Sequence, residues 1–187
     1  MSMRMKRAAV FAVLALAMTM WTSGCSNNTT PMQSKTSAVK ILSVSSRAKP
    51  LVPDQLQTSA SILVTQDVGG VIVVGEPDVF GEPILTIPAG AVSEPTTINM
   101  TISYDGPITV DLEPHGIQFA EPVEIAISYK PADLTGVDLE QINVYYFNES
   151  LATPDWELVP NSASVPGEFS VTAPLSHFSR YAPGSEG

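Results

Sequence analysis

Two stretches of regular alternation decide the fold: "INMTISY", from Ile98 to Tyr104, and "PVEIAISY", from Pro122 to Tyr129. In both stretches, hydrophobic residues occupy every second position. The first hydrophobic set is Ile98, Met100, Ile102 and Tyr104, and the second is Val123, Ile125, Ile127 and Tyr129. Successive side chains of a strand point to opposite faces, so a period of two predicts strands with one buried face.

Shorter hydrophobic stretches continue on both sides of these two, separated by turn residues such as Gly69-Gly70 and Asp105-Gly106-Pro107. We expect further strands at 60–66, 70–74, 84–87, 108–112, 142–147, 156–159, 169–173 and 177–182. Many short strands with no long helical period are typical of an antiparallel sandwich. The sequence therefore predicts an all-β fold, a single antiparallel β-sandwich over residues 59–184, with one short helical turn in the connection 131–140.

The first 24 residues have the pattern of an export signal. Three basic residues precede the hydrophobic run 8–20, which is too short to span a bilayer as a helix. The run ends at "WTSGC", where the only cysteine, Cys25, follows two small residues. This stretch resembles the lipobox of bacterial lipoproteins, although Thr22 stands where that family most often has leucine. The resemblance implies a helical signal peptide over 1–24, cleavage before Cys25 and lipidation of its thiol. Ordinary cleavage that leaves a free thiol is the alternative.

A lipidated Cys25 makes membrane lipid the first partner of the chain. Several acyl chains, at about 0.8 kcal/mol per buried methylene, hold a protein on a membrane essentially permanently. In the lipoprotein family, a residue other than Asp after the cysteine, here Ser26, directs the protein to the outer membrane. We therefore predict an exported protein, anchored to the bacterial cell envelope at the outer membrane, with a flexible tether over 25–58 behind its anchor.

Charge separates the tether from the domain. Residues 26–53 contain basic residues and no acid. From Asp54 onward, all 19 acidic residues stand against two basic ones, Lys130 and Arg180, which gives this part a net charge of −17. Such a surface repels nucleic acid and anionic lipid, since both are negatively charged. We expect no nucleic-acid partner.

Two further stretches carry a family resemblance: "LTIPAGAV", Leu85 to Val92, and "LEPHGIQFAEPVEIAISY", Leu112 to Tyr129. Together they resemble the ZU5 domain, and the similarity extends over 65–182. The matching positions are Pro88, Gly90, Ala91, Pro114, Gly116, Phe119, Pro122 and Val123. The resemblance implies a β-sandwich that serves as an interaction or assembly module, and it implies no reaction. The residues themselves indicate structural roles, since glycine allows turn conformations that side chains bar.

The triplet His177-Phe178-Ser179 near the end of the chain permits two interpretations. Some ZU5-related proteins cleave themselves between Phe and Ser of such a triplet, which here makes Ser179 the nucleophile and His177 the base. In a strand, His177 and Ser179 share one face while Phe178 packs into the core on the other. We expect an ordinary closing strand, and self-cleavage between Phe178 and Ser179 is the alternative.

Other chemistry finds little support in the sequence. One cysteine and two histidines, His115 and His177, cannot supply the usual ligands of a zinc site, and no phosphate-binding loop or nucleophile elbow is present. We therefore predict no cofactor, no metal and no enzymatic activity, with a calcium-stabilised structural module as a further alternative.

The expected function is a non-enzymatic interaction or structural module that binds a protein or an envelope glycan. Its contacts would come from a sheet edge or from loops. The candidate loops are 75–83, with Glu76, Asp78, Phe80 and Glu82, and 148–156, with Trp156. For both we favour the alternative of a solvated loop, with Trp156 buried.

Overall fold

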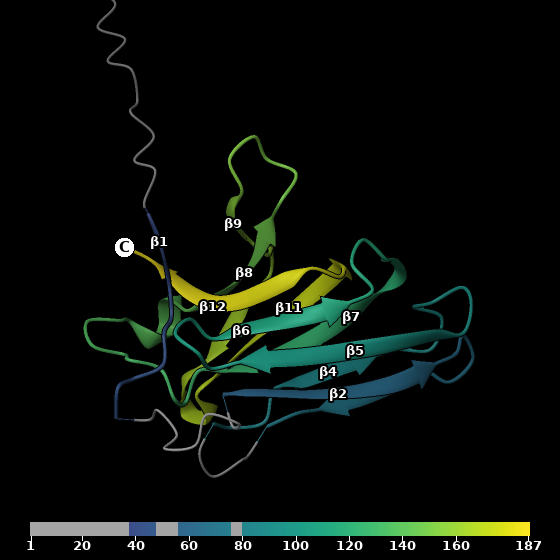
Figure 1. Ribbon diagram of the computed structural model, residues 1–187, viewed down its shortest axis with the longest axis horizontal. Helices are drawn as coiled ribbons and strands as arrows, with labels where there is room; N and C mark the ends of the chain where they lie inside the picture. Colours follow the sequence, from purple (N-terminus) through teal and green to yellow (C-terminus); the bar gives the residue numbers. More distant parts are fainter. Residues whose placement is uncertain (1–37, 48–55, 76–79) are drawn as a thin grey trace, which may run out of the picture. The chain divides into compact units, whose positions relative to one another are not determined.

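The computed structural model describes residues 38–47, 56–75 and 80–187. These residues form twelve strands in two antiparallel sheets, joined by turns and loops (Figure 1). The seven-stranded sheet has the order β2 (Gln57–Val64), β5 (Thr96–Ser103), β6 (Thr109–Glu113), β12 (Arg180–Glu186), β8 (Asn143–Asn148) and β9 (Asp155–Leu158), with β1 (Val39–Ile41) paired to β12. The five-stranded sheet has the order β10 (Ala163–Val165), β11 (Ser170–His177), β7 (Gln118–Ser128), β4 (Ile84–Ile87) and β3 (Gly70–Val73). The predicted all-β sandwich is confirmed.

The core lies between the two sheets and contains both sets of alternating residues. Ile98, Met100 and Ile102 on β5 are fully buried, as are Val123 and Ile125 on β7. Each such side chain stabilises the fold by roughly 1.5–3 kcal/mol relative to its exposed state. Residues between them on β5 face away from the core and are partly exposed. The hydrophobic period therefore sets which face of each sheet is buried.

Two short 3-10 turns accompany the strands. The first, Leu139–Gln141, begins in the predicted connection 131–140 and confirms the helical turn expected there. Asp138 caps it, because its carboxylate accepts a hydrogen bond from the Glu140 N–H at 3.1 Å. The second turn, Pro166–Glu168, joins β10 to β11, and Phe169 follows it in a left-handed conformation at φ 51°.

The prediction of a flexible tether over 25–58 is wrong for the part that contains β1. Val39–Ile41 pairs with the end of β12, and Leu42 is fully buried in the core. The Leu42 N–H donates to the Pro183 carbonyl at 2.9 Å, so this segment completes the sheet. The apolar Leu42 explains the difference, because burying its side chain in the core is favourable, whereas a solvated tether would leave it exposed to water. Strand β2 also begins at Gln57, within the predicted tether.

The predicted closing strand over 177–182 is also wrong in its bounds. Strand β11 extends to His177, strand β12 begins at Arg180, and Phe178 and Ser179 lie between them. β11 belongs to the five-stranded sheet and β12 to the seven-stranded sheet, so the chain changes sheets within the triplet. The sequence does not predict strand β10, because three residues are too few to establish a period of two.

The predicted signal peptide 1–24 and Cys25 lie outside the described residues. No helix in the described part of the chain has the length and hydrophobicity needed to cross a membrane.

Candidate functional site

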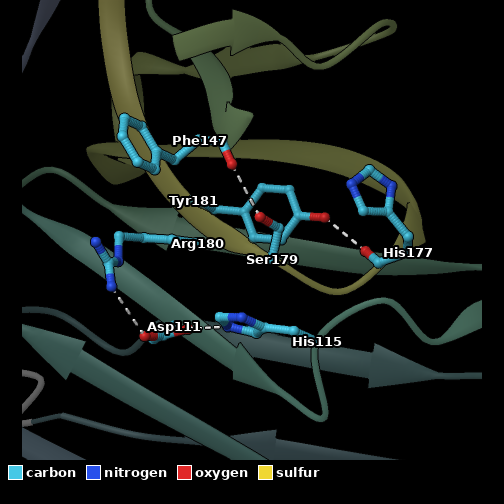
Figure 2. A network of polar contacts seen from close by, with 7 residues as sticks. All are labelled: Asp111, His115, Phe147, His177, Ser179, Arg180 and Tyr181. Atoms are coloured by element: carbon cyan, nitrogen blue, oxygen red, sulfur yellow. Dashed lines mark hydrogen bonds and ion pairs between the residues drawn. The ribbon is translucent and has the colours of Figure 1, made fainter. Parts of the chain in front are cut away.

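The His177-Phe178-Ser179 triplet forms the crossing from β11 to β12 (Figure 2). The Phe178 side chain is 1% exposed and meets the ring of Phe119 edge-on, with 4.6 Å between ring centroids. Its core position confirms the expectation that Phe178 anchors the end of the chain. Because β11 and β12 belong to different sheets, the chain passes from one sheet to the other at Phe178, and one continuous strand through the triplet is excluded.

Hydrogen bonds hold this crossing against three neighbouring elements. The Tyr181 hydroxyl donates to the His177 carbonyl at 2.5 Å, and the Ser179 hydroxyl donates to the Phe147 carbonyl on β8 at 3.1 Å (Figure 2). The Phe178 carbonyl accepts from the Gly116 N–H at 3.1 Å. Burial raises the pKa of Tyr181 strongly, so its hydroxyl keeps its proton and its role as donor at physiological pH. These hydrogen bonds therefore fix the conformation of the crossing.

The His177 imidazole takes part in a different set of contacts. Its Nδ1 lies 3.4 Å from the Ser176 hydroxyl, and its ring meets the Tyr146 ring edge-on at 5.2 Å. Burial lowers the pKa of His177, because the charged imidazolium loses solvation there. Figure 2 shows the imidazole directed away from Ser179. Among the described residues, no hydrogen bond joins His177 to the Ser179 hydroxyl.

The predicted arrangement of His177 and Ser179 on one face of a strand is therefore wrong. The bend at Phe178 separates the two side chains, and each has its own partner. One component that self-cleavage would use is present, since the Gly116 N–H points at the carbonyl that the nucleophile would attack. The general base is not in place, because the Ser179 hydroxyl donates to Phe147 instead of to an imidazole.

A cavity of about 280 Å³ lies beside the crossing. Tyr146, Glu157, Pro160, Pro174, His177 and Tyr181 are among the residues that line it. The Glu157 carboxylate accepts hydrogen bonds from the Tyr146 hydroxyl and from Asn148 Nδ2, the latter at 3.0 Å. These two bonds lower the pKa of Glu157, with that from Tyr146 the stronger. The charged group of this cavity thus already has two hydrogen-bond partners.

A second hollow, the outer groove, crosses the outward face of the seven-stranded sheet and measures about 390 Å³. Its floor is formed by polar side chains: Gln57, Thr101, Ser103, Thr109, Asp111 and Arg180. Trp156 of β9, Ile41 of β1 and Pro107 complete the lining. Polar floor residues alternate along β5 and β6 with buried ones, so the groove lies on the face opposite the core.

Asp111, which lines the outer groove, is the centre of a polar network with Arg180 and His115 (Figure 2). One carboxylate oxygen lies 3.6 Å from Arg180 Nη2, and the other lies 2.6 Å from His115 Nε2. Arg180 and Asp111 are also register partners on neighbouring strands. Opposite charges on facing positions attract each other, so the pair is stabilised where it stands. Trp156 packs against Phe147 at a ring-centroid distance of 5.2 Å and remains half-buried.

The loops proposed from the sequence as contacts fare differently. Phe80 is 2% exposed and stacks on Tyr104 at 4.4 Å, so it belongs to the core. Glu82 is exposed, whereas Glu76 and Asp78 lie outside the described residues. Trp156, considered as a contact of the second loop, lines the outer groove. The rest of the groove was missed, because its residues come from distant strands that only the sheet order brings together.

No three His, Cys, Asp or Glu side chains within 38–47, 56–75 and 80–187 are arranged to hold a metal ion. No protein-family model matches the chain, and no curated protein is significantly similar to it.

Proposed function

We propose that this chain is a lipid-anchored envelope protein whose ZU5-like sandwich binds another envelope component and catalyses no reaction. The anchor is Cys25, and the location is the outer membrane. The sequence "WTSGC" after a hydrophobic run supports the anchor. Left-handed conformations at Gly90 and Gly116, at φ 85° and 77°, agree with the turn roles that the ZU5-like motifs give these residues.

The observation that carries the binding role is the outer groove. At about 390 Å³ it lies within the size range of small-ligand sites, and it combines an aromatic side chain with hydroxyl, amide and charged groups. Its lining comes from β1, β2, β5, β6, β9 and β12, which the sheet holds rigidly. Rigid elements reduce the ordering cost of binding, so a site of this kind can act without rearrangement.

The contacts of Ser179 and His177 favour a structural role for the triplet over self-cleavage. A nucleophile needs a base within hydrogen-bond reach, whereas the Ser179 hydroxyl donates to a backbone carbonyl. Buried Phe178 and the Tyr181 hydroxyl instead give the triplet the task of joining the two sheets. We infer that the Phe178–Ser179 peptide bond stays intact.

The test of anchor and triplet is an intact mass of the full chain, expressed in a bacterium and extracted from membranes in detergent. We expect the mass of residues 25–187 plus acyl groups, and in Cys25→Ser the loss of the acyl mass together with release from the membrane. An unmodified cysteine contradicts the anchor. A species that ends at Phe178 and disappears in Ser179→Ala contradicts the non-enzymatic function.

The test of binding is a photo-crosslinking residue placed at Ser103 in the outer groove, with the same residue at exposed Thr86 on the opposite sheet as the control. Irradiation of whole cells should give an adduct of increased mass at position 103 and none at 86. Equal adducts at both positions, or none at either, would remove the support for a binding site in the groove.

A further inference from the structure

We propose that the ligand of the outer groove is an uncharged glycan. This inference rests on the proposed function, since it names the chemical class of component that the groove binds. The argument uses three properties of the lining: its charge balance, its inventory of hydrogen-bonding groups, and the position of Trp156.

The lining of the outer groove is locally neutral. Its charged side chains are Asp111 and Arg180, which pair with each other at 3.6 Å. The surrounding domain carries 19 acidic residues against two basic ones from Asp54 onward. An anionic polymer would be repelled by this field, and a cationic one would meet an Asp111 whose two oxygens already have partners. Charge complementarity therefore favours a ligand without net charge.

The floor offers many hydrogen bonds from groups that can both donate and accept. Thr101, Ser103 and Thr109 present hydroxyls, and Gln57 presents an amide. The Arg180 guanidinium carries five N–H donors, and its side chain is 43% exposed, so donors remain for a ligand after the contact with Asp111. A ligand that matches this floor has closely spaced hydroxyls of its own. Sugars have that chemistry.

Trp156 adds a flat, apolar surface at the side of the polar floor. The indole is half-buried and is fixed against Phe147, so little side-chain entropy is lost when a ligand contacts it. A pyranose ring presents C–H groups on its faces and hydroxyls around its edge. Stacked on Trp156, such a ring would place its hydroxyls towards Thr109, Asp111 and Arg180 in the same groove.

A peptide fits the groove less well than a glycan does. Peptides that join a sheet add a strand at its edge, because main-chain groups there are unpaired. The groove lies on the sheet face, where the backbones of β5, β6 and β12 are already paired with one another. Protein interfaces also have an apolar, charge-depleted centre, whereas the centre of this groove is the Asp111–Arg180 pair.

The experiment uses the protein extracted from membranes in detergent, which we expect to begin at Cys25 and in which Trp156 is then the only tryptophan. Its fluorescence is followed during titration with three neutral tetrasaccharides: tetra-N-acetylchitotetraose, maltotetraose and mannotetraose. A sulfated and a cationic tetrasaccharide are the charged comparisons. We expect saturable binding of at least one neutral probe. Its Kd should change less than about twofold when salt is raised, because a ligand without charge has no charge attraction that salt could screen.

Two variants of this protein, followed by calorimetry, assign the binding to the groove. Thr109→Val keeps the shape of the side chain and removes its hydroxyl, and we expect binding about fivefold weaker. Trp156→Ala should weaken binding at least tenfold. The matched control is Thr86→Val on the outward face of the five-stranded sheet, which should bind as the parent does. Circular dichroism establishes that each variant is folded.

Failure of the glycan proposal and of the proposed function can be told apart. Binding of no neutral probe, stronger binding of a charged probe, or equal loss in Thr86→Val and Thr109→Val would overturn the glycan proposal. If the crosslinker at Ser103 then captures a protein, the groove binds a protein and the proposed function stands. If it captures nothing, both proposals fall.

Discussion

Among the connections that carry the chain from one sheet to the other, two do so by opposite means. Between β2 and β3, residues Thr65 to Gly69 turn through backbone hydrogen bonds, with the Gly69 N–H donating to the Thr65 carbonyl at 3.1 Å. Between β11 and β12, side chains do the same task, with Phe178 buried and the Ser179 and Tyr181 hydroxyls bonded to carbonyls. The first connection depends on the absence of a side chain at Gly69, and the second depends on the presence of three.

The comparison predicts its largest effect at Phe178, the anchor of the second connection. Phe178→Ala removes a fully buried ring and leaves a cavity beside Phe119, so we expect the free energy of unfolding to fall by about 3–5 kcal/mol. Urea denaturation followed by circular dichroism measures it. The control is Leu63→Ala next to the first connection, where the side chain is 62% exposed and the change should stay within about 0.5 kcal/mol. Similar losses in both variants would contradict the assignment of Phe178 as an anchor.

Gly69 should show the next largest effect, for the opposite reason. A Cβ there would lie 2.3 Å from the Ile87 carbonyl oxygen and 2.8 Å from the Ala89 nitrogen, both backbone atoms that cannot rotate away. Gly69→Ala should therefore cost about 2–3 kcal/mol of stability. Gly106→Ala is the matched control, because Gly106 also has a positive φ but has no atom within 4 Å of the added Cβ. It should cost about 1 kcal/mol, from the backbone conformation alone. Equal costs in urea denaturation would mean that the close approach at Gly69 relaxes.

The two connections also differ in how far the sequence predicts them. The adjacent glycines at 69 and 70 interrupt two hydrophobic stretches, so the turn between β2 and β3 is evident from local chemistry. The triplet at 177–179 has the alternation of a strand. That the chain changes sheets where Phe178 is buried depends on tertiary packing, which no local pattern contains. The same reasoning applies to Leu42, because its hydrogen-bond partner Pro183 is far from it in the sequence. Outer-groove residues such as Gln57 and Arg180 meet only through the strand order, which alternation does not determine.

Loss of the Tyr181 hydroxyl should have a smaller effect than either change above. Tyr181→Phe leaves the His177 carbonyl without this donor, and we expect a loss of about 1–2 kcal/mol in the free energy of unfolding. Tyr145→Phe provides the control, because the buried Tyr145 hydroxyl has no hydrogen-bond partner among the described residues. Its removal should leave stability unchanged or raise it, since an unpaired buried hydroxyl is unfavourable. If Tyr145→Phe lowers the free energy of unfolding as much as Tyr181→Phe does, the hydrogen bond from Tyr181 to the His177 carbonyl does not stabilise the second connection specifically.

The smallest expected effect is a pH dependence that belongs to the second connection alone. Burial holds the pKa of His177 below its unfolded value of 6.5, so the unfolded chain binds more protons than the folded one as the pH falls through that value. The stability contributed by the neutral imidazole is therefore complete above pH 6.5 and is lost below it. The loss should be well under about 1 kcal/mol, because the imidazole is only partly buried.

Urea denaturation at pH 7.5, 6.5 and 5.5 measures this dependence on pH. His177→Gln should flatten it, because the variant lacks the imidazole that titrates. The groups that face the imidazole, Tyr146, Tyr181 and Ser176, are unchanged in the variant. If the dependence persists in His177→Gln, the titrating group lies elsewhere, and the two connections do not differ in their response to pH. If it disappears, a side-chain joint carries a sensitivity to protons that a glycine turn cannot have.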